Sequence, residues 1–241
     1  MNTVDLKREL FDIPYPDEVA PISLGILGKG FFPGAVGSLP HLAGRGGLLL
    51  LGQDFGRTDY YESRCGDNDE FCTTWTNVCR TYQIALEGQP VWYSNYLMGA
   101  RKPPLPATGD LRKYIHSAMQ WERFEASCWK FLHAQIEYQR PQLIVVLGGP
   151  NRLRLSNINR LATGWDRYPT ETATVNACVQ QGLSQSRTFP LRDGTAHTTK
   201  LTYAFHPCYG QGTAKLELIA KDAQRVAGYW LRLISELLPS T

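Results

Sequence analysis

The stretch GLLLLGQDFG, residues 47–56, determines the predicted fold. Its four consecutive leucines form a short apolar run, which is typical of a strand buried on both faces of a parallel sheet. Further strands are predicted at 91–94, 143–147 and 200–205. The sequence therefore predicts a central, mainly parallel, four-stranded sheet.

Helical patterns lie between and after these strands. Apolar residues recur at helical spacing in three segments, 73–87, 110–139 and 213–238. The strand at 200–205 is also the second arm of a hairpin whose first arm is 189–192. Because strands that alternate with helices form right-handed crossovers, the pattern predicts an α/β fold of three layers, α/β/α.

Residues 1–46 differ in composition from the rest of the chain. They are rich in Gly and Pro, which predicts an irregular N-terminal segment packed on the main domain. That domain is expected to comprise residues 47–241. Within it, the polar interval 150–187 receives no assigned element.

The composition is that of an ordinary globular protein. The 241 residues include 25 Lys and Arg against 22 Asp and Glu, and a formal charge of +3 does not indicate a protein that coats nucleic acid. No run reaches the ~20 apolar residues of a membrane span, and the charged start MNTVDLKREL argues against a signal peptide. Six cysteines without a C-x-x-C are expected to be reduced thiols rather than metal ligands. We expect a cytoplasmic monomer that does not contact a membrane.

Polar side chains follow three of the predicted strands. Gln53 and Asp54 come after the first strand, Asn95 after the second and His206 after the fourth. Because ligands bind beyond the carboxyl ends of parallel strands, these side chains are expected to converge on one edge of the sheet. Taken alone, Asp54 is explained equally well as a helix cap or turn former, and Asn95 and His206 are explained more simply as turn residues. Their shared placement favours a site.

These groups suit hydrolysis of an N-glycosidic bond. A carboxylate orients water and offsets the positive charge that develops on the sugar. An amide offers a donor and an acceptor to the edge of a planar base. An imidazole donates a hydrogen bond to an oxygen that becomes anionic as the base leaves.

The order of the segments resembles the uracil-DNA glycosylase superfamily. The resemblance covers about 47–235 and rests on LLLLGQDFG, Ser94-Asn95, RPQLIVVLG and FHPCY. Its strongest block, Cys128 to Gly148, is similar to the iron–sulfur branch called family 4. The resemblance implies a glycosylase of base excision repair that flips uracil or a related deaminated base out of single- or double-stranded DNA.

The resemblance also implies roles for individual residues. Asp54 would activate water and face the sugar cation, His206 would stabilise the base oxygen, and Asn95 would read the pyrimidine edge. The ring that stacks on the flipped base is matched best by Phe71 and next by Tyr61. Phe71 is explained equally well as a hydrophobic contact at a helix start.

The chain departs from the family pattern at several positions. Within the substrate-binding motif that begins at Gln53, Phe55 stands where the family has Pro, and Gly56 stands where the classical branch has Tyr. Cys208 stands where the family has Ser. The loop that follows lacks the bulky apolar residue that fills the vacated base position in the family, and Tyr209 is the candidate to replace it. The related branch holds its iron–sulfur cluster with four cysteines, and only one of them has an equivalent in this chain, Cys128. We therefore expect no cluster and no other cofactor.

Basic side chains on the expected binding edge would contact DNA phosphates. Those singled out are Arg101, Arg152 and Lys215, with Arg57, Lys102 and Arg154 as further members. Any one of them is explained more simply as a solvated surface charge. Two alternatives stay open: an inactive glycosylase-fold protein that binds nucleic acid or a protein partner, and an enzyme acting on a free nucleoside or nucleotide.

Overall fold

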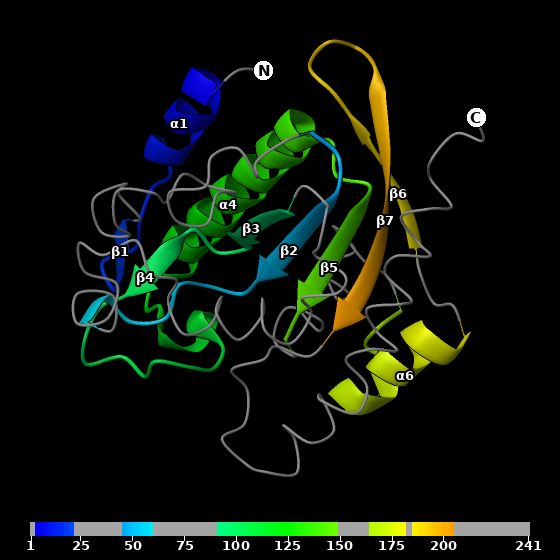
Figure 1. The fold of residues 1–241 in the computed structure, drawn as a ribbon. Helices are drawn as coiled ribbons and strands as arrows, with labels where there is room; N and C mark the ends of the chain where they lie inside the picture. Colours follow the sequence, from blue (N-terminus) through cyan, green and yellow to red (C-terminus); the bar gives the residue numbers. More distant parts are fainter. Residues whose placement is uncertain (1–2, 22–44, 60–90, 149–163, 182–184, 205–241) are drawn as a thin grey trace.

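The computed structural model describes residues 3–21, 45–59, 91–148, 164–181 and 185–204 (Figure 1). Strands of these residues form one five-stranded sheet in the order β3-β2-β5-β7-β6. They are β2 (Leu48–Gly52), β3 (Val91–Asn95), β5 (Leu143–Leu147), β6 (Gln185–Pro190) and β7 (Ala196–Ala204). β3, β2, β5 and β7 are parallel, and β6 is antiparallel to β7. The predicted mixed α/β class with a mostly parallel sheet is confirmed.

The predicted count of four strands is wrong, because the first arm of the hairpin is a full member of the sheet. β6 pairs with β7 from Gln185↔Leu201 to Pro190↔Ala196. Only Phe189 of β6 is buried, and the other side chains are partly or fully exposed. Only the end of this strand is hydrophobic enough to be recognised in the sequence, whereas the backbone pairing begins at Gln185.

β2 and β5 lie at the centre of the sheet. Every residue of both strands is buried, and the four leucines of β2 have no exposed surface. Apolar side chains on both faces of a strand require cover on both faces. The continuous apolar runs were therefore a reliable signal for these two strands.

The helix predicted over 110–139 is two elements. A short 3₁₀ helix, η2 (Leu111–Tyr114), is capped by Asp110, and α4 (Ala118–Gln139) is capped by Ser117, whose side chain accepts a hydrogen bond from the Gln120 amide. Two N-caps in close succession break the helix, because each starts its own run of backbone hydrogen bonds. α4 ends at Arg140, which adopts the left-handed conformation (φ 56°).

The N-terminal residues contain regular structure. α1 (Thr3–Phe11) packs on α4, and β1 (Val19–Pro21) pairs antiparallel with β4 (Gly99–Arg101) (Figure 1). Leu6 and Leu10 are fully buried in the same core as the central strands. α1 therefore belongs to the core that supports the sheet.

The interval left unassigned in the sequence contains α6 (Glu171–Gln181). Its start carries a recognisable signal, since the Thr170 side chain accepts a hydrogen bond from the Ala173 amide. The helices expected at 73–87 and 213–238 lie outside the described residues. No helix in the described part of the chain is long and apolar enough to cross a membrane.

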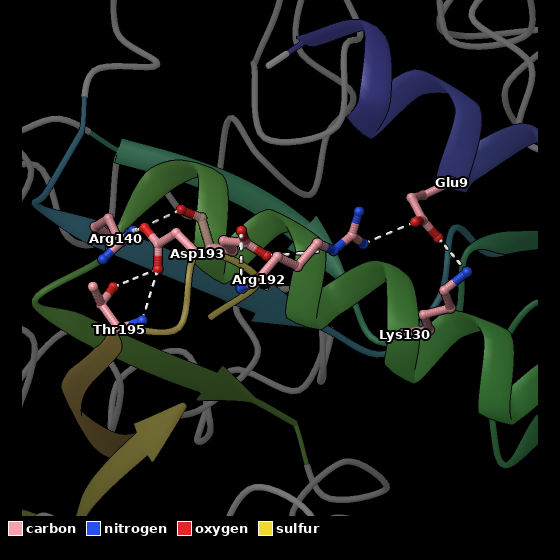
Figure 2. Close-up of polar contacts among 7 residues, drawn as sticks. Glu9, Lys130, Arg140, Arg192, Asp193 and Thr195 are labelled. Atoms are coloured by element: carbon pink, nitrogen blue, oxygen red, sulfur yellow. Dashed lines mark hydrogen bonds and ion pairs between the residues drawn. The ribbon is translucent and has the colours of Figure 1, made fainter. Parts of the chain in front are cut away.

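A charged network joins α1, α4 and the turn of the hairpin (Figure 2). The Glu9 carboxylate contacts Lys130 Nζ and Arg192 Nη2, each at 2.8 Å, and its side chain is only 9% exposed. Arg192 Nε also lies 3.6 Å from Glu137 Oε2. The network extends along the second half of α4, from Lys130 to Glu137. It ties the N-terminal helix to the body of the domain.

The hairpin turn is fixed by Asp193. Asp193 Oδ1 accepts hydrogen bonds from the Thr195 amide (2.9 Å) and hydroxyl (2.5 Å), and Gly194 adopts φ 81°. These hydrogen bonds lower the pKa of Asp193. Arg140 at the end of α4 contacts the same carboxylate at 3.3 Å, as Figure 2 shows. The turn therefore has a defined place against the helix.

The Glu9 contacts predict how stability depends on pH. Burial raises the pKa of Glu9, but hydrogen bonds from Lys130 and Arg192 outweigh it, so the pKa lies below its ordinary value of 4.5. A folded-state pKa below the unfolded value gives stability that is complete above pH 4.5 and lost as the pH falls through the folded pKa. Glu9→Gln should therefore flatten the acid limb of the unfolding free energy, by at most about 1.4 kcal/mol per pH unit.

Chemical denaturation across the acidic range measures this effect. Asp12→Asn is the matched control, because it removes one carboxylate charge from an exposed position just after the same helix. The control should keep the acid dependence of the wild type. Equal slopes for wild type and Glu9→Gln would show that the network is not formed in solution.

Two buried glutamines of α4 allow a sharper test of packing. Gln139 Nε2 donates to the carbonyl oxygens of Leu48 (2.8 Å) and Gly46 (3.2 Å), which ties the helix end to the start of β2. Gln135, one turn earlier, is equally buried, and its side-chain amide makes no hydrogen bond among the described residues. A buried polar group without a partner carries a desolvation cost of about 1–3 kcal/mol.

Leucine substitutions at the two positions should therefore have opposite effects. Gln135→Leu removes an unpartnered amide and should raise the free energy of unfolding by about 1 kcal/mol. Gln139→Leu leaves the carbonyls of Leu48 and Gly46, of which the first is buried, without this donor and should lower it by about 1–3 kcal/mol. Urea unfolding of both variants beside wild type measures the difference. Equal destabilisation by both would mean that Gln135 has a partner in solution.

Candidate active site at the carboxyl edge of the sheet

The carboxyl ends of four parallel strands form one edge, which we call the carboxyl edge. Gly52 of β2 pairs with Asn95 of β3, and Leu147 of β5 pairs with Ala204 of β7. The carboxyl ends of these paired strands therefore lie side by side at this edge (Figure 1). Of the residues expected to converge there, the structure brings Gln53, Asp54 and Asn95 together.

The Asp54 carboxylate is held at this edge by two hydrogen bonds. Its Oδ2 accepts a hydrogen bond from Arg101 Nη2 at 2.6 Å, and its Oδ1 accepts one from the Gly56 amide at 2.9 Å. The side chain is only 7% exposed. The bond to Gly56 is the contact of a turn-forming Asp, and Gly56 adopts φ 72°, which a glycine tolerates. Asp54 thus shapes the turn and also carries a buried charge.

Arg101 occupies an unexpected place. It was expected on an exposed loop where it would meet DNA phosphates, but it is the last residue of β4 and is 1% exposed. Its Nη1 donates to the carbonyls of Pro106 (3.1 Å) and Thr108 (2.9 Å), and its Nη2 to that of Gly109 (2.6 Å). A guanidinium enclosed in this way cannot reach a phosphate of a docked duplex, which corrects the expectation.

The residues beside Asp54 have structural partners as well. Gln53 Nε2 donates to the Gly109 carbonyl at 2.8 Å, so the loop 106–109 is bonded to both Gln53 and Arg101. Phe55 is 2% exposed and packs in the hydrophobic core, so its ring does not lie at the surface where a base would stack. The expectation of a substrate contact from Phe55 is therefore corrected by its burial.

Asn95 lies over Gly52. The side chain of Asn95 is nearly buried, at 4% exposed, and a Cβ atom on Gly52 would overlap its amide oxygen. The Tyr96 amide donates to the Gly52 carbonyl at 2.8 Å, which continues the pairing past the strand ends. The Asn95 amide therefore lies at the carboxyl end of β3, against the end of β2.

Two basic residues near this edge form local contacts. Arg57 makes a two-point ion pair with Asp59, whose hydrogen bond raises the pKa of the guanidinium. Lys102 Nζ donates to the Asp17 carbonyl at 2.8 Å. Both groups are at least partly exposed, so a phosphate contact remains compatible with their positions.

The other predicted site residues lie outside the described residues. They are the proposed base-oxygen partner, the stacking rings and the remaining DNA contacts: His206, Phe71, Tyr61, Cys208, Tyr209, Arg152, Arg154 and Lys215. What the sequence did not reveal is the pairing of Asp54 with Arg101, which are 47 residues apart. No local pattern signals such a pair, because it depends on β4 meeting the end of β2.

Cys128, the only counterpart of a cluster cysteine, has a different contact. Its thiol is buried and accepts a hydrogen bond from the Met98 amide at 3.3 Å. In the described segments no group of three or more His, Cys, Asp or Glu side chains could hold a metal ion. The sulfur of Cys128 therefore serves as a buried acceptor that joins α4 to the segment between β3 and β4.

No protein-family model matches the sequence, and no curated protein gives a significant match. A functional assignment therefore depends on the chemistry of the carboxyl edge. Its described groups are an ion-paired carboxylate, a nearly buried amide and a loop bonded to both Gln53 and Arg101.

Proposed function

We propose that the protein is a DNA glycosylase that hydrolyses the N-glycosidic bond of uracil or a related deaminated base. The observation that carries the proposal is the pairing of Gly52 with Asn95, which sets the Asp54 carboxylate and the Asn95 amide at neighbouring strand ends. His206 follows Ala204, the end of the fourth parallel strand, after one intervening residue. The proposal includes the three-layer glycosylase-like fold and a cytoplasmic monomer as the working form.

The proposed reaction divides charge between the two fragments. The bond between C1′ and the base nitrogen breaks, and its electron pair goes to the base. Ionised Asp54 faces the cationic sugar and orients a water molecule, whose oxygen bonds to C1′. One proton of that water stays on the new hydroxyl, and the other ends on the released base. His206 donates a hydrogen bond to the base oxygen while it is anionic, and Asn95 pairs with the base edge.

The electrostatics of Asp54 support this role. The reaction needs a carboxylate that is charged at neutral pH, and a guanidinium at 2.6 Å favours the charged form. The nearly buried setting strengthens its interaction with a sugar cation, because charges interact more strongly away from bulk water. Access to the base requires that the nucleotide be flipped out of the stack.

A second candidate is a glycosylase-fold protein that binds nucleic acid without cleaving it. Both Asp54 oxygens already accept hydrogen bonds, and the side chain is only 7% exposed, which limits the approach of water. Departures from the family pattern at Phe55 and Cys208 point the same way.

Single-turnover cleavage of labelled oligonucleotides tests the proposal. The oligonucleotides carry uracil, hypoxanthine or xanthine and are used single- and double-stranded, with wild type beside His206→Ala. Excision by wild type and a rate about 10²-fold lower in the variant would support the proposed function. Folded wild-type protein that excises none of these bases would overturn it. Salt-dependent DNA binding would then identify the binding protein of the second candidate.

A further inference from the structure

We propose that Arg101 is the positioning residue of the site, which fixes the Asp54 carboxylate in the orientation needed to direct water. This inference rests on the proposed glycosylase function. It differs from a DNA contact, since the guanidinium is turned inward and is 1% exposed. Arg101 therefore acts through Asp54 and not on the substrate.

The contacts of Arg101 define a rigid frame. Nη2 is shared between Asp54 Oδ2 and the Gly109 carbonyl, both at 2.6 Å, while Nη1 donates to Pro106 and Thr108. A guanidinium is planar, so these four acceptors have fixed directions relative to one another. The loop 106–109 thus holds the guanidinium, and the guanidinium holds the carboxylate.

The carboxylate has little freedom within this frame. One oxygen accepts from Arg101 and the other from the Gly56 amide, so rotation of the carboxylate would break both hydrogen bonds. Fixed orientation matters for water-directed chemistry, because an error of about 1 Å in the position of a reacting group can lower a rate about 10²-fold.

Stability alone does not account for this arrangement. A buried ion pair is often no better than well-packed apolar side chains of similar volume. Arg101 Nε is buried and makes no hydrogen bond within the described residues, so this N–H group loses its hydration without gaining a hydrogen bond. A buried ion pair with an unsatisfied donor, at the edge of a parallel sheet where ligands bind in α/β folds, fits a functional role better than a stabilising one.

A double-mutant cycle on the chemical step tests the inference. The proteins are wild type, Arg101→Lys, Asp54→Asn and the double variant, with uracil-containing oligonucleotide at saturating enzyme. Arg101→Lys keeps the charge but loses the planar fork, and should lower the maximal single-turnover rate about 10–100-fold with the half-saturating enzyme concentration unchanged. In the Asp54→Asn variant, Arg101→Lys should lower the maximal rate by less than about threefold, because the carboxylate that Arg101 positions is gone.

A matched control and a second variant complete the design. Arg112→Lys changes another arginine that donates to a backbone carbonyl, that of Ile115 at 3.3 Å, and should leave the rate unchanged. If Arg101→Lys does not fold, Gly109→Ala replaces it in the cycle. Gly109 adopts φ 98°, and a Cβ there would make only an ordinary contact with the Tyr114 hydroxyl at 3.9 Å, so alanine strains the backbone and shifts the carbonyl that Arg101 binds.

The outcomes separate the two proposals. The role of Arg101 would be overturned, with the glycosylase function intact, if Arg101→Lys lowered the maximal rate equally with Asp54 and with Asn at position 54. It would also be overturned if Arg101→Lys changed the half-saturating enzyme concentration and left the maximal rate unchanged. Wild-type protein without excision would overturn the glycosylase function, and the positioning role with it. A loss of rate that appears only when Asp54 is present, and not in the Asp54→Asn variant, would establish Arg101 as the positioning residue.

Discussion

Replacing Asp54 by Asn is expected to lower the single-turnover rate of base excision by about 10²-fold or more, with DNA binding retained. Asn has nearly the same shape as Asp, and its amide oxygen can still accept the hydrogen bond from the Gly56 amide. What it lacks is the negative charge that faces the sugar cation and holds the water. The loss should therefore appear in the chemical step and not in the affinity for DNA.

The comparison needs a second Asp→Asn variant. Asp59 lies five residues further along the same segment, and its side chain is 42% exposed in an ion pair with Arg57. Asp59→Asn should excise at the rate of wild type. Because Asp54→Asn also leaves Arg101 with an unpaired charge, the assay temperature should lie well below the unfolding midpoint of the variant. Excision by Asp54→Asn at the wild-type rate would remove Asp54 from the mechanism.

The largest effect on stability is expected for Arg101→Met, which should lower the free energy of unfolding by about 3–5 kcal/mol. Methionine fills much of the arginine volume but leaves the nearly buried Asp54 carboxylate without its counter-charge. It also leaves the carbonyls of Pro106, Thr108 and Gly109 without the donors that the guanidinium supplies. Most of the loss therefore comes from the nearly buried Asp54 carboxylate, because Pro106 and Thr108 are exposed and the Gly109 carbonyl keeps its hydrogen bond from Gln53.

Urea unfolding provides the measurement, and the double variant provides the internal check. Adding Asp54→Asn to Arg101→Met removes the uncompensated charge and should restore part of the lost stability. Arg57→Met, which breaks a more exposed ion pair nearby, should leave stability almost unchanged. A loss below about 1 kcal/mol for Arg101→Met would show that the Asp54–Arg101 pair is open in solution.

The centre of the sheet was predictable because β2 and β5 are continuous apolar runs. Both strands are buried along their whole length, so composition alone marks them, and the helical segments predicted between the strands indicate parallel pairing. β6 was only half recognised, because five of its six side chains are at least partly exposed and only Phe189 carries the hydrophobic signal. α6 was missed for a similar reason, since it lies in a polar interval and buries few large side chains.

The site was predictable only in part. Asp54 and Asn95 could be placed together, because residues that follow neighbouring parallel strands share an edge. The inward turn of Arg101 could not be predicted, since it depends on the contact of β4 with the loop 106–109 and with the end of β2. The same is true of Phe55, for which sequence alone does not distinguish a buried ring from one that stacks on a ligand.

The close approach of Gly52 and Asn95 limits which pairs of residues the two positions can hold together. A side chain at position 52 would occupy the space of the Asn95 amide oxygen, so a chain with alanine or a larger residue there must give up or displace the amide. The absence of a side chain at Gly52 is thus what allows the Asn95 amide its present position. In a deep mutational scan, tolerance at position 52 should appear only in backgrounds that carry a smaller residue at position 95.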